Sequence, residues 1–246
     1  MNPLVSIIIP SYNRFEWLQD AIQSVKKQTY SHIEIIVVND NSTDPKYLKL
    51  DKSINQINLN HNNCSRSKFG KPCGAYCRNI GIKKSKGEYI CFLDDDDYWL
   101  PEKVEKQLKV MKDRKYNFSM TNSFIMDPRI VYQNFKVKEY INNNNTSYCY
   151  PKNLMKGIDN KLPEVWNSDF FKDKNHGTTS SCMIKRNIIK EIGFMTEVPN
   201  WGQYQGVYQD WDYWKRISKK YNCLYLSEPL VVWYKHKRGL TKIYNK

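Results

Sequence analysis

The sequence predicts an α/β protein with a mostly parallel central sheet. Three short apolar segments, at residues 4–9, 33–38 and 89–93, are rich in β-branched or aromatic side chains, as buried strands are. Segments with helical spacing separate them along the chain. The order strand, helix, strand, helix, strand produces a parallel sheet with helices on both faces, and continuous apolar runs fit strands that are covered on both sides.

Each helix of the first half has its own local signals. The first is predicted at residues 14–28, where apolar side chains recur on one face. The second is expected at about residues 74–86, with Gly87 as its stop signal. Pro101 begins a third helix, rich in Lys and Glu, that runs to about residue 115.

The second half of the chain is less regular. No internal repeat or break in composition divides the chain, so we expect one domain over residues 1–246, with a first half to about residue 115 and a second half that forms the other wall of a cleft. The predicted elements there are strands at 117–126 and 178–184, a helix at 185–193 ended by Gly193, a helix at 210–220, and short strands at 224–226 and 230–234.

The composition excludes some classes of protein. With 40% hydrophobic and 14% aromatic residues, the chain can bury a core, which excludes a disordered protein. No apolar run reaches the ~20 residues of a membrane span, and the start lacks the basic segment of a signal peptide, so we expect a cytoplasmic protein. Lys plus Arg is 39 against 25 Asp plus Glu, a net charge of +14. That charge fits nucleic acid, an anionic membrane surface or a phosphate-bearing substrate.

The seven cysteines agree with a reducing compartment, because their number is odd and no secretory signal precedes them. Four residues of the types that bind zinc lie within a stretch of seventeen residues: His61, Cys64, Cys73 and Cys77. Their spacing is irregular and contains no CxxC pair. A polar loop with scattered thiols is therefore favoured over a zinc site.

Polar clusters follow each of the three predicted strands of the first half. Tyr12, Asn13 and Arg14 follow the first strand, Asp40 the second, and the run 94–97 of four aspartates the third. Ligands of open parallel sheets bind beyond the carboxyl ends of the strands. The sequence therefore predicts a site at this edge of the sheet.

The four aspartates favour a divalent cation. Adjacent carboxylates repel one another, and Mg²⁺ or Mn²⁺ removes that repulsion by binding their oxygens. Asp94 and Asp96 can project into one site from an extended segment, whereas Asp97 is the candidate for capping the next helix. A solvated acidic turn is the alternative. Positive side chains that could hold a diphosphate beside the metal are Arg14, Lys68, Lys71 and Arg78.

Several motifs, taken in order, resemble a family 2 glycosyltransferase of the GT-A fold. This resemblance implies a Rossmann-like sheet with a smaller second sheet in the acceptor half, a nucleotide-sugar-binding first half, and an inverting, nucleotide-sugar-dependent reaction. The matching segments are VSIIIPSYNR at 5–14, IIVVNDNSTD at 35–44, RNIG at 78–81, KGEYI at 86–90, FLDDDDYW at 92–99, QDWDYWKR at 209–216 and YKH at 234–236.

The resemblance implies roles for residues on the donor side. The nucleotide base would be held by Pro10, Tyr12, Asn13 and Asp40. Asp94 would contact the ribose or the metal, and Arg14, Arg78 and Asp95 would also contact the nucleotide-sugar. Asp96 would be the main ligand of Mn²⁺ or Mg²⁺, and His236 could complete the metal shell or be a surface residue of a basic tail. The donor would be a UDP-sugar.

The resemblance makes Asp210 the catalytic base on the acceptor side. Asp212 is the competing base, but its position two residues further along a helix points it away from Asp210. The family often has Glu before the base, and here that residue is Gln209. Trp201 could stack on an acceptor sugar or serve in packing.

We therefore predict a metal-dependent glycosyltransferase that acts on a glycan, lipid or protein hydroxyl. The alternatives are a basic nucleic-acid-binding protein, which leaves the aspartates unexplained, and a nucleotidyltransferase of similar fold, which would carry a Gly-rich loop where this chain has Pro10. No nucleic-acid partner is expected. Peripheral association with the cytoplasmic face of a membrane stays open.

Overall fold

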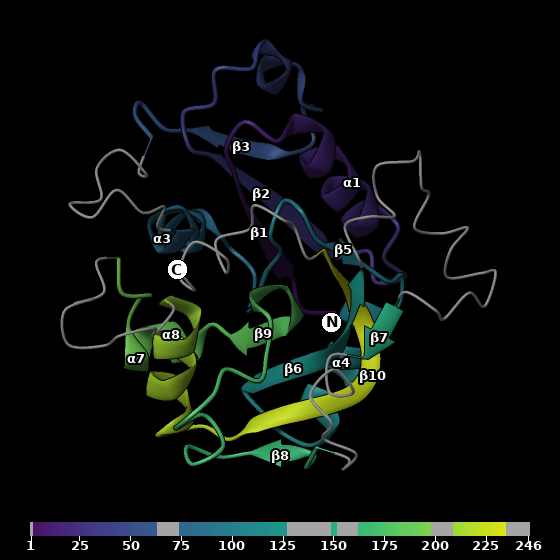
Figure 1. Ribbon diagram of the computed structural model, residues 1–246, viewed down its shortest axis with the longest axis vertical. Coiled ribbons are helices and arrows are strands. Elements are labelled where there is room, and N and C mark those ends of the chain that lie inside the picture. Colours follow the sequence, from purple (N-terminus) through teal and green to yellow (C-terminus); the bar gives the residue numbers. More distant parts are fainter. Residues whose placement is uncertain (1, 63–73, 127–148, 152–161, 198–208, 235–246) are drawn as a thin grey trace.

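The computed structural model describes residues 2–62, 74–126, 149–151, 162–197 and 209–234. The strands of these residues form one sheet with the order β3-β2-β1-β4-β9-β6-β10-β5, with β7 also paired to β6 and β8 to β10. Helices lie on both faces of this sheet (Figure 1). The predicted α/β fold class is confirmed.

The first half of the chain supplies a parallel set of strands. β1 is central and pairs in parallel with β2 and with β4, while β2 pairs in parallel with β3. β3 was not predicted, because its four residues, NQIN, lack an apolar run. The bounds are β1 (Val5–Ser11), β2 (Ile33–Asn39), β3 (Asn55–Asn58) and β4 (Tyr89–Phe92).

The second half continues the same sheet, where a separate smaller sheet was expected. β9 pairs antiparallel with both β4 and β6, and this shared strand joins the two halves. The two short strands predicted near the C-terminus form one long strand, β10, whose register to β6 shifts on both sides of Pro229. The bounds are β5 (Tyr98–Trp99), β6 (Phe118–Met126), β7 (Cys149–Pro151), β8 (Val165–Trp166), β9 (Cys182–Lys185) and β10 (Cys223–Tyr234).

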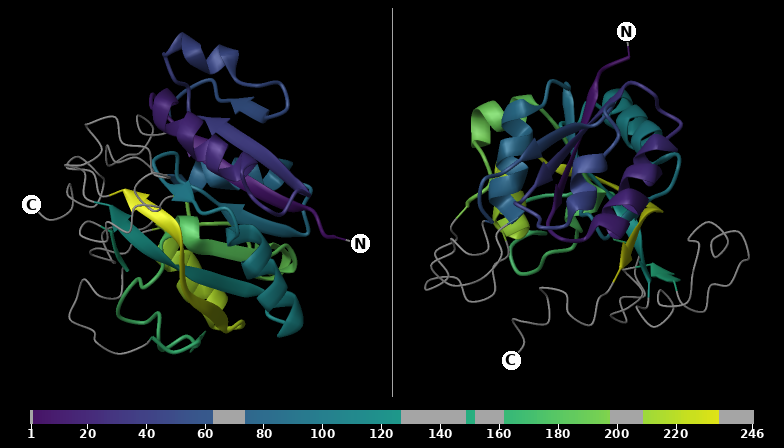
Figure 2. Two further views of the ribbon diagram at one scale, coloured as in Figure 1. Left: turned by 90° about the vertical axis from the view of Figure 1, so that its right-hand side faces the viewer. Right: turned by 90° about the horizontal axis from the view of Figure 1, so that it is seen from above.

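Two apolar cores lie on opposite faces of the sheet. On one face α1 (Phe15–Lys26) and α4 (Lys103–Asp113) pack against Val5, Ile7 and Ile9 of β1. On the other, where Ile8 points, the covering helices are α3 (Gly74–Lys84), α7 (Asn187–Ile192) and α8 (Gln209–Ser218). Figure 2 shows α1 and α3 on either side of the strands. Because both faces of β1 are covered, most of its side chains are apolar and even its two serines, Ser6 and Ser11, are buried.

Gly87 has a different role from the predicted helix stop. α3 ends at Lys84, before Gly87 is reached. A Cβ at Gly87 would lie 2.6 Å from the backbone nitrogen of Ser6 and 2.8 Å from the carbonyl oxygen of Leu4. The chain therefore needs glycine here because its backbone passes too close to the start of β1 for any side chain. Gly193 does follow the last residue of α7, with a φ of 83°.

Thr121 of β6 provides a stability prediction. Its side chain is buried, and its hydroxyl has no hydrogen-bond partner within the described part of the chain. Thr121→Val replaces this unpaired hydroxyl with a methyl group of similar size, so we expect a gain of about 1 kcal/mol in the free energy of unfolding. Thermal unfolding should show a melting temperature higher by about 2–4 °C.

Ser119, two residues earlier on the same strand, is the matched contrast. Its hydroxyl accepts a hydrogen bond from Gln107 Nε2 at 2.9 Å and is equally buried. Ser119→Ala should therefore lower the melting temperature. A lower melting temperature for Thr121→Val would contradict the prediction.

The described cysteines are free and buried: Cys77, Cys91, Cys182 and Cys223. Two of the zinc candidates, Cys64 and Cys73, lie outside the described residues. In the described segments no helix is both long and apolar enough to span a bilayer.

Candidate active site

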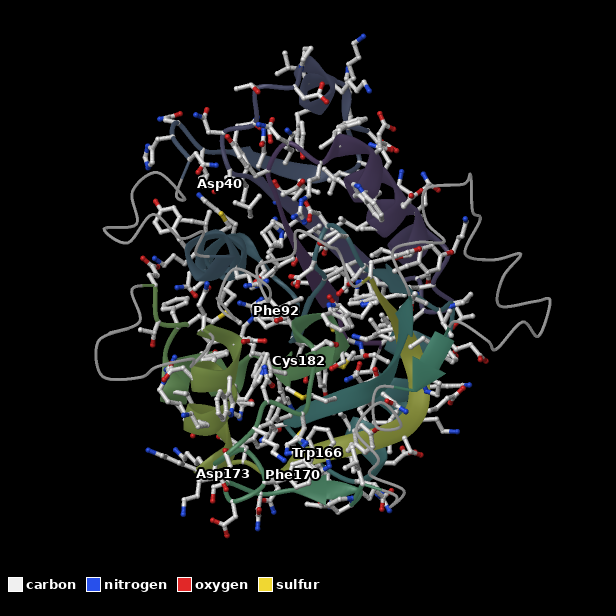
Figure 3. All side chains as sticks on the ribbon, in the orientation of Figure 1. Asp40, Phe92, Trp166, Phe170, Asp173 and Cys182 are labelled. Carbon is white, nitrogen blue, oxygen red and sulfur yellow. The ribbon has the colours of Figure 1, made fainter. Side chains whose placement is uncertain are left out.

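The loops that follow β1 and β2 are joined at the carboxyl edge of the sheet. The backbone nitrogen of Asp40 donates to the carbonyl of Ser11 at 2.9 Å. Asn13, which has a φ of 49°, accepts from the backbone nitrogen of Thr43 at 2.9 Å and donates its own to Ser42 Oγ at 2.9 Å. Figure 3 places Asp40 in the half of the molecule that holds β1 to β3. These bonds fix the two expected nucleotide-side loops relative to each other.

The four aspartates form a tight turn after β4, where the sequence suggested an extended segment. The backbone nitrogen of Asp97 donates to the carbonyl of Asp94 at 3.0 Å. This turn brings Asp97 back to the same side as Asp94 and Asp96, and oxygens of these three carboxylates all lie within 4.8 Å of one another. We call these three residues the carboxylate cluster.

Asp97 is not the helix cap that the sequence suggested. α4 begins at Lys103, and Glu102 occupies the N-cap position. Asp97 is instead buried, and its carboxylate accepts a hydrogen bond from Ser180 Oγ at 2.5 Å. The spacing along the chain misled the prediction because the two-residue strand β5 lies between the aspartates and the helix.

Asp95 points away from the carboxylate cluster. It is buried and accepts hydrogen bonds from Ser11 Oγ at 2.7 Å and from Arg14 Nη1 at 3.3 Å. Burial and then the charge of Asp96 raise the pKa of Asp95 to about 7. The structure gives it contacts within the protein, and its expected contact with the donor stays a prediction.

Two guanidinium groups partly neutralise the aspartates. Arg14 Nη1 lies 2.6 Å from Asp96 Oδ2, and Arg78 Nη2 lies 2.5 Å from Asp94 Oδ1. Burial opposes the charge of both arginines, but the adjacent aspartates outweigh it and raise the pKa of each guanidinium. Among the described residues, Asp94, Asp95 and Asp96 of this turn therefore form ion pairs with two arginines.

The remaining negative charge fits a divalent cation. Burial raises the pKa of Asp94, and that of Asp97 well above its usual range, with further contributions from neighbouring aspartates. Such shifts mean that the ionised cluster is costly without a counter-ion. The positive charge of a divalent cation would lower that cost, and an all-oxygen donor set suits Mg²⁺ or Mn²⁺.

Asp210 lies in the first turn of α8. Asn175 Nδ2 and Thr179 Oγ1 each donate to Asp210 Oδ2 at 3.1 Å. Burial lowers the pKa of Arg78, but Asp94 outweighs it and the charge of Asp210 adds to the raised value. The pKa of Asp94 is raised by burial first and then by Asp96 and Asp210, against the effect of Arg78. The structure thus brings Asp210 within electrostatic range of the carboxylate cluster.

Asp212 points elsewhere, as the helical spacing predicted. Its carboxylate accepts from Thr196 Oγ1 at 2.8 Å and forms an ion pair with Arg216 at 3.1 Å. Gln209 also faces away from Asp210's partners, because its Oε1 accepts from the backbone nitrogen of Ala75 at 2.5 Å, at the start of α3. A neutral amide oxygen satisfies that helix terminus as a carboxylate oxygen could.

The remaining predicted site residues lie at the edge of the site, within β1, or outside the described residues. Tyr12 is 40% exposed at the site edge, available to a ligand ring. Pro10 is part of β1, opposite Val38 of β2. Lys68, Lys71, Trp201 and His236 lie outside the described residues.

The polar residues that bond to the charged side chains were not predicted individually, although residues 176–182 were expected to line the acceptor cleft. Tyr47 links the loops through hydrogen bonds with Ser11 Oγ at 2.6 Å and with the backbone nitrogen of Arg14 at 3.1 Å. Asn175, Thr179 and Ser180 hold carboxylates from a distant part of the chain. The only available signal was the concentration of hydroxyls in the segment TTSS at 178–181.

A protein-family model matches most of the chain. It is described as Glycosyl transferase family 2 and covers residues 6–193. The matched range includes the strands of the first half, the aspartate turn and the segment 178–181. Asp210 lies beyond its end.

Curated relatives are similar over about half of the chain. The putative teichuronic acid biosynthesis glycosyltransferase TuaG of Bacillus subtilis is 38% identical over 130 residues, which are 50% of this chain and 48% of the relative. The UDP-Glc:alpha-D-GlcNAc-diphosphoundecaprenol beta-1,3-glucosyltransferase WfaP of Escherichia coli is 39% identical over 122 residues, 50% of this chain and 47% of the relative. The chain therefore spans about half the length of these two relatives.

Solved glycosyltransferase structures share the fold. Residues 1–349 of S. aureus TarS, in complex with UDP-GlcNAc, superpose with a TM-score of 0.66 at 18% identity, covering 97% of this chain and 60% of that one. The mannosyltransferase PcManGT from Pyrobaculum calidifontis, in complex with GDP-Man and Mn²⁺, has a TM-score of 0.60 at 18% identity, covering 99% and 60%. At these identities the likeness concerns the fold alone.

Proposed function

Because this chain belongs to glycosyl transferase family 2, we propose that it is a metal-dependent, inverting transferase that moves a sugar from a UDP-sugar to an acceptor hydroxyl. The observation that carries the proposal is the arrangement of two carboxylate sites around Arg78. Asp94 of the carboxylate cluster pairs with Arg78 at 2.5 Å, and the charge of Asp210 also acts on Arg78 and adds to the raised pKa of its guanidinium.

The donor side is proposed at the carboxyl edge of β1, β2 and β4. Asp94, Asp96 and Asp97 would hold Mn²⁺ or Mg²⁺, which when bound neutralises the developing charge of the nucleoside diphosphate leaving group. Asp40 and Tyr12, on the joined loops, would contact the nucleotide base. Arg14 and Arg78 already pair with the aspartates and would lie beside the diphosphate, for which a planar guanidinium is suited.

Asp210 is the proposed general base. An acceptor hydroxyl is a weak nucleophile at neutral pH, and a carboxylate in hydrogen-bond reach takes its proton as the new glycosidic bond forms. Asn175 and Thr179 occupy one oxygen of Asp210 and keep the group oriented. A single base on the acceptor side implies direct displacement with inversion at the anomeric carbon.

The proposed donor and acceptor follow the Escherichia coli relative WfaP. The name of WfaP gives UDP-Glc as its donor and a diphosphoundecaprenol-linked sugar as its acceptor. We propose a UDP-sugar and a lipid-linked acceptor for this chain as well, which would place it at a membrane surface. The net charge of +14 is compatible with binding at an anionic bilayer. The nucleic-acid-binding and nucleotidyltransferase alternatives are not favoured.

A donor panel tests this function. The purified protein is incubated with UDP- and GDP-sugars and Mn²⁺ or Mg²⁺, and released nucleoside diphosphate is measured with a synthetic lipid-diphosphate-sugar acceptor. We expect release from at least one UDP-sugar, and a loss of at least about a hundredfold when the metal is chelated. Equal release with and without chelator, or release from no donor, would refute the proposal.

A further inference from the structure

One short buried turn contacts both carboxylate sites. The 3₁₀ turn η3 (Thr179–Ser181) leads into β9, and Thr179 is 7% exposed while Ser180 is fully buried. Its adjacent residues Thr179 and Ser180 point their hydroxyls at different aspartates. The sequence predicts a strand at 178–184 and places residues 176–182 in the lining of the acceptor cleft, without a role for the individual hydroxyls.

Ser180 holds the aspartate turn at two points. Its Oγ donates to Asp97 Oδ2 at 2.5 Å and accepts from the backbone nitrogen of Asp94 at 3.0 Å. One hydroxyl thus fixes both ends of the turn that forms the carboxylate cluster. It also supplies a partner to a carboxylate whose burial would otherwise leave it poorly solvated.

Thr179 holds the proposed base. Its Oγ1 donates to Asp210 Oδ2 at 3.1 Å, beside the bond from Asn175. The other oxygen of Asp210 accepts from the backbone nitrogen of Trp211 at 2.8 Å. Both oxygens of Asp210 therefore have fixed partners, and Thr179 shares with Asn175 the bonds that orient the carboxylate.

The turn itself is anchored from the opposite side. Trp99 Nε1 donates to the carbonyl of Ser180 at 2.9 Å, and Gln107 Nε2 donates to the carbonyl of Ser181 at 3.0 Å. Ser181 Oγ closes the turn on the carbonyl of Thr178 at 2.7 Å. Since β9 is paired on both edges, the backbone that carries the two hydroxyls is held by the central sheet.

We propose that Thr179 and Ser180 are positioning residues that set the base and the metal-binding cluster in register from adjacent positions of one rigid turn. The inference rests on the proposed function and adds to it the device that fixes the acceptor side relative to the donor side. Catalytic groups must be held close to their productive geometry for the full rate. Because Thr179 bonds to the base and Ser180 to the metal-binding cluster, we expect Thr179 to affect kcat and Ser180 to affect metal activation.

The experiment compares Thr179→Val, Thr179→Ser and Ser180→Ala in the full chain. Thr179→Val should lower kcat at least about tenfold, with the KM for donor and the Mn²⁺ concentration for half activation within about twofold. Thr179→Ser restores the hydroxyl and should recover most of kcat. Ser180→Ala should raise the Mn²⁺ concentration for half activation by about 10–100-fold, as loss of a group that orients a metal ligand does. Calorimetric titration with Mn²⁺ alone should show the same weakening.

Thr121→Val is the matched control, because it makes the same substitution as Thr179→Val at a buried threonine outside this network. It should leave kcat and metal activation unchanged. Ser180→Cys, which keeps the side-chain size with a weaker donor, substitutes for Ser180→Ala if the latter does not fold.

Wild-type protein that transfers no sugar overturns the proposed function and this inference with it. If the wild-type protein transfers sugar, two results would overturn the positioning role alone. One is that Thr179→Val and Ser180→Ala both change kcat only, or both change the Mn²⁺ concentration for half activation only. The other is that Thr179→Ser does not recover kcat.

Discussion

Asp210→Asn should lower kcat for sugar transfer by about 10²–10⁴-fold, the contribution expected of a general base. The substitution keeps the size of the side chain and an oxygen that can accept from Asn175 and Thr179, whose bonds to Asp210 are 3.1 Å long. It removes the ability to take a proton. Binding of UDP-sugar with Mn²⁺, measured by calorimetry, should change by less than about threefold, since no step of donor binding needs the base.

Asp212→Asn is the control for this prediction. Asp212 lies on the same helix and differs from Asp210 in its partners, Thr196 and Arg216. Its ion pair with Arg216 joins side chains that are 29% and 33% exposed, so its loss should cost well under about 1 kcal/mol of stability. We expect kcat of Asp212→Asn within about threefold of wild type. A larger loss of kcat in Asp212→Asn than in Asp210→Asn would assign the base to Asp212.

The strands and their site edge were predictable because the relevant signals are local. An apolar run such as IIVV at 35–38 in β2 favours burial on both faces, which a parallel sheet between two helix layers provides. Once β1, β2 and β4 are parallel, the residues after them must lie at one edge. The bond between Asp40 and Ser11 follows from that topology.

The course of the chain through the aspartate turn was not predictable in the same way. An alternation rule assigned Asp94 and Asp96 to one side, but that rule holds only for extended backbone. The bond from Asp97 to the carbonyl of Asp94 closes a turn and brings Asp97 into the cluster. The turn is stabilised by Ser180, which is more than eighty residues away, so no local signal specifies it.

The continuation of the sheet into the second half also depends on distant residues. β9 is a four-residue strand that pairs with β4 and β6 at once. Its sequence, CMIK, favours a strand but does not indicate its neighbours. Register and partner choice come from the packing of Phe118, Ile184 and Trp214 in the core that α8 covers, which is a property of the assembled fold.

The metal-free protein should become less stable as the pH rises from 5.5 to 8, and Mn²⁺ should reverse this loss. The pKa of Asp95 is about 7 in the folded protein against an ordinary value of 3.8. An acid whose pKa is raised by folding binds more protons folded than unfolded, so its ionisation favours the unfolded chain. Asp95 alone should lower the free energy of unfolding by about 2 kcal/mol over this range. Asp94 and Asp97, whose pKa values are also raised, act in the same direction.

Thermal unfolding at the two pH values, with chelator and with Mn²⁺, measures this coupling. Mn²⁺ should raise the melting temperature more at pH 8 than at pH 5.5, because the metal competes with protons for the same carboxylates. Asp95→Asn is the informative variant, since Asp95 is outside the carboxylate cluster yet contributes to the penalty. It should weaken the pH dependence of the metal-free protein while leaving Mn²⁺ stabilisation in place. A metal-free protein equally stable at both pH values would contradict the raised pKa values of the buried aspartates. Mn²⁺ stabilisation that does not depend on pH would mean that the metal does not bind these carboxylates.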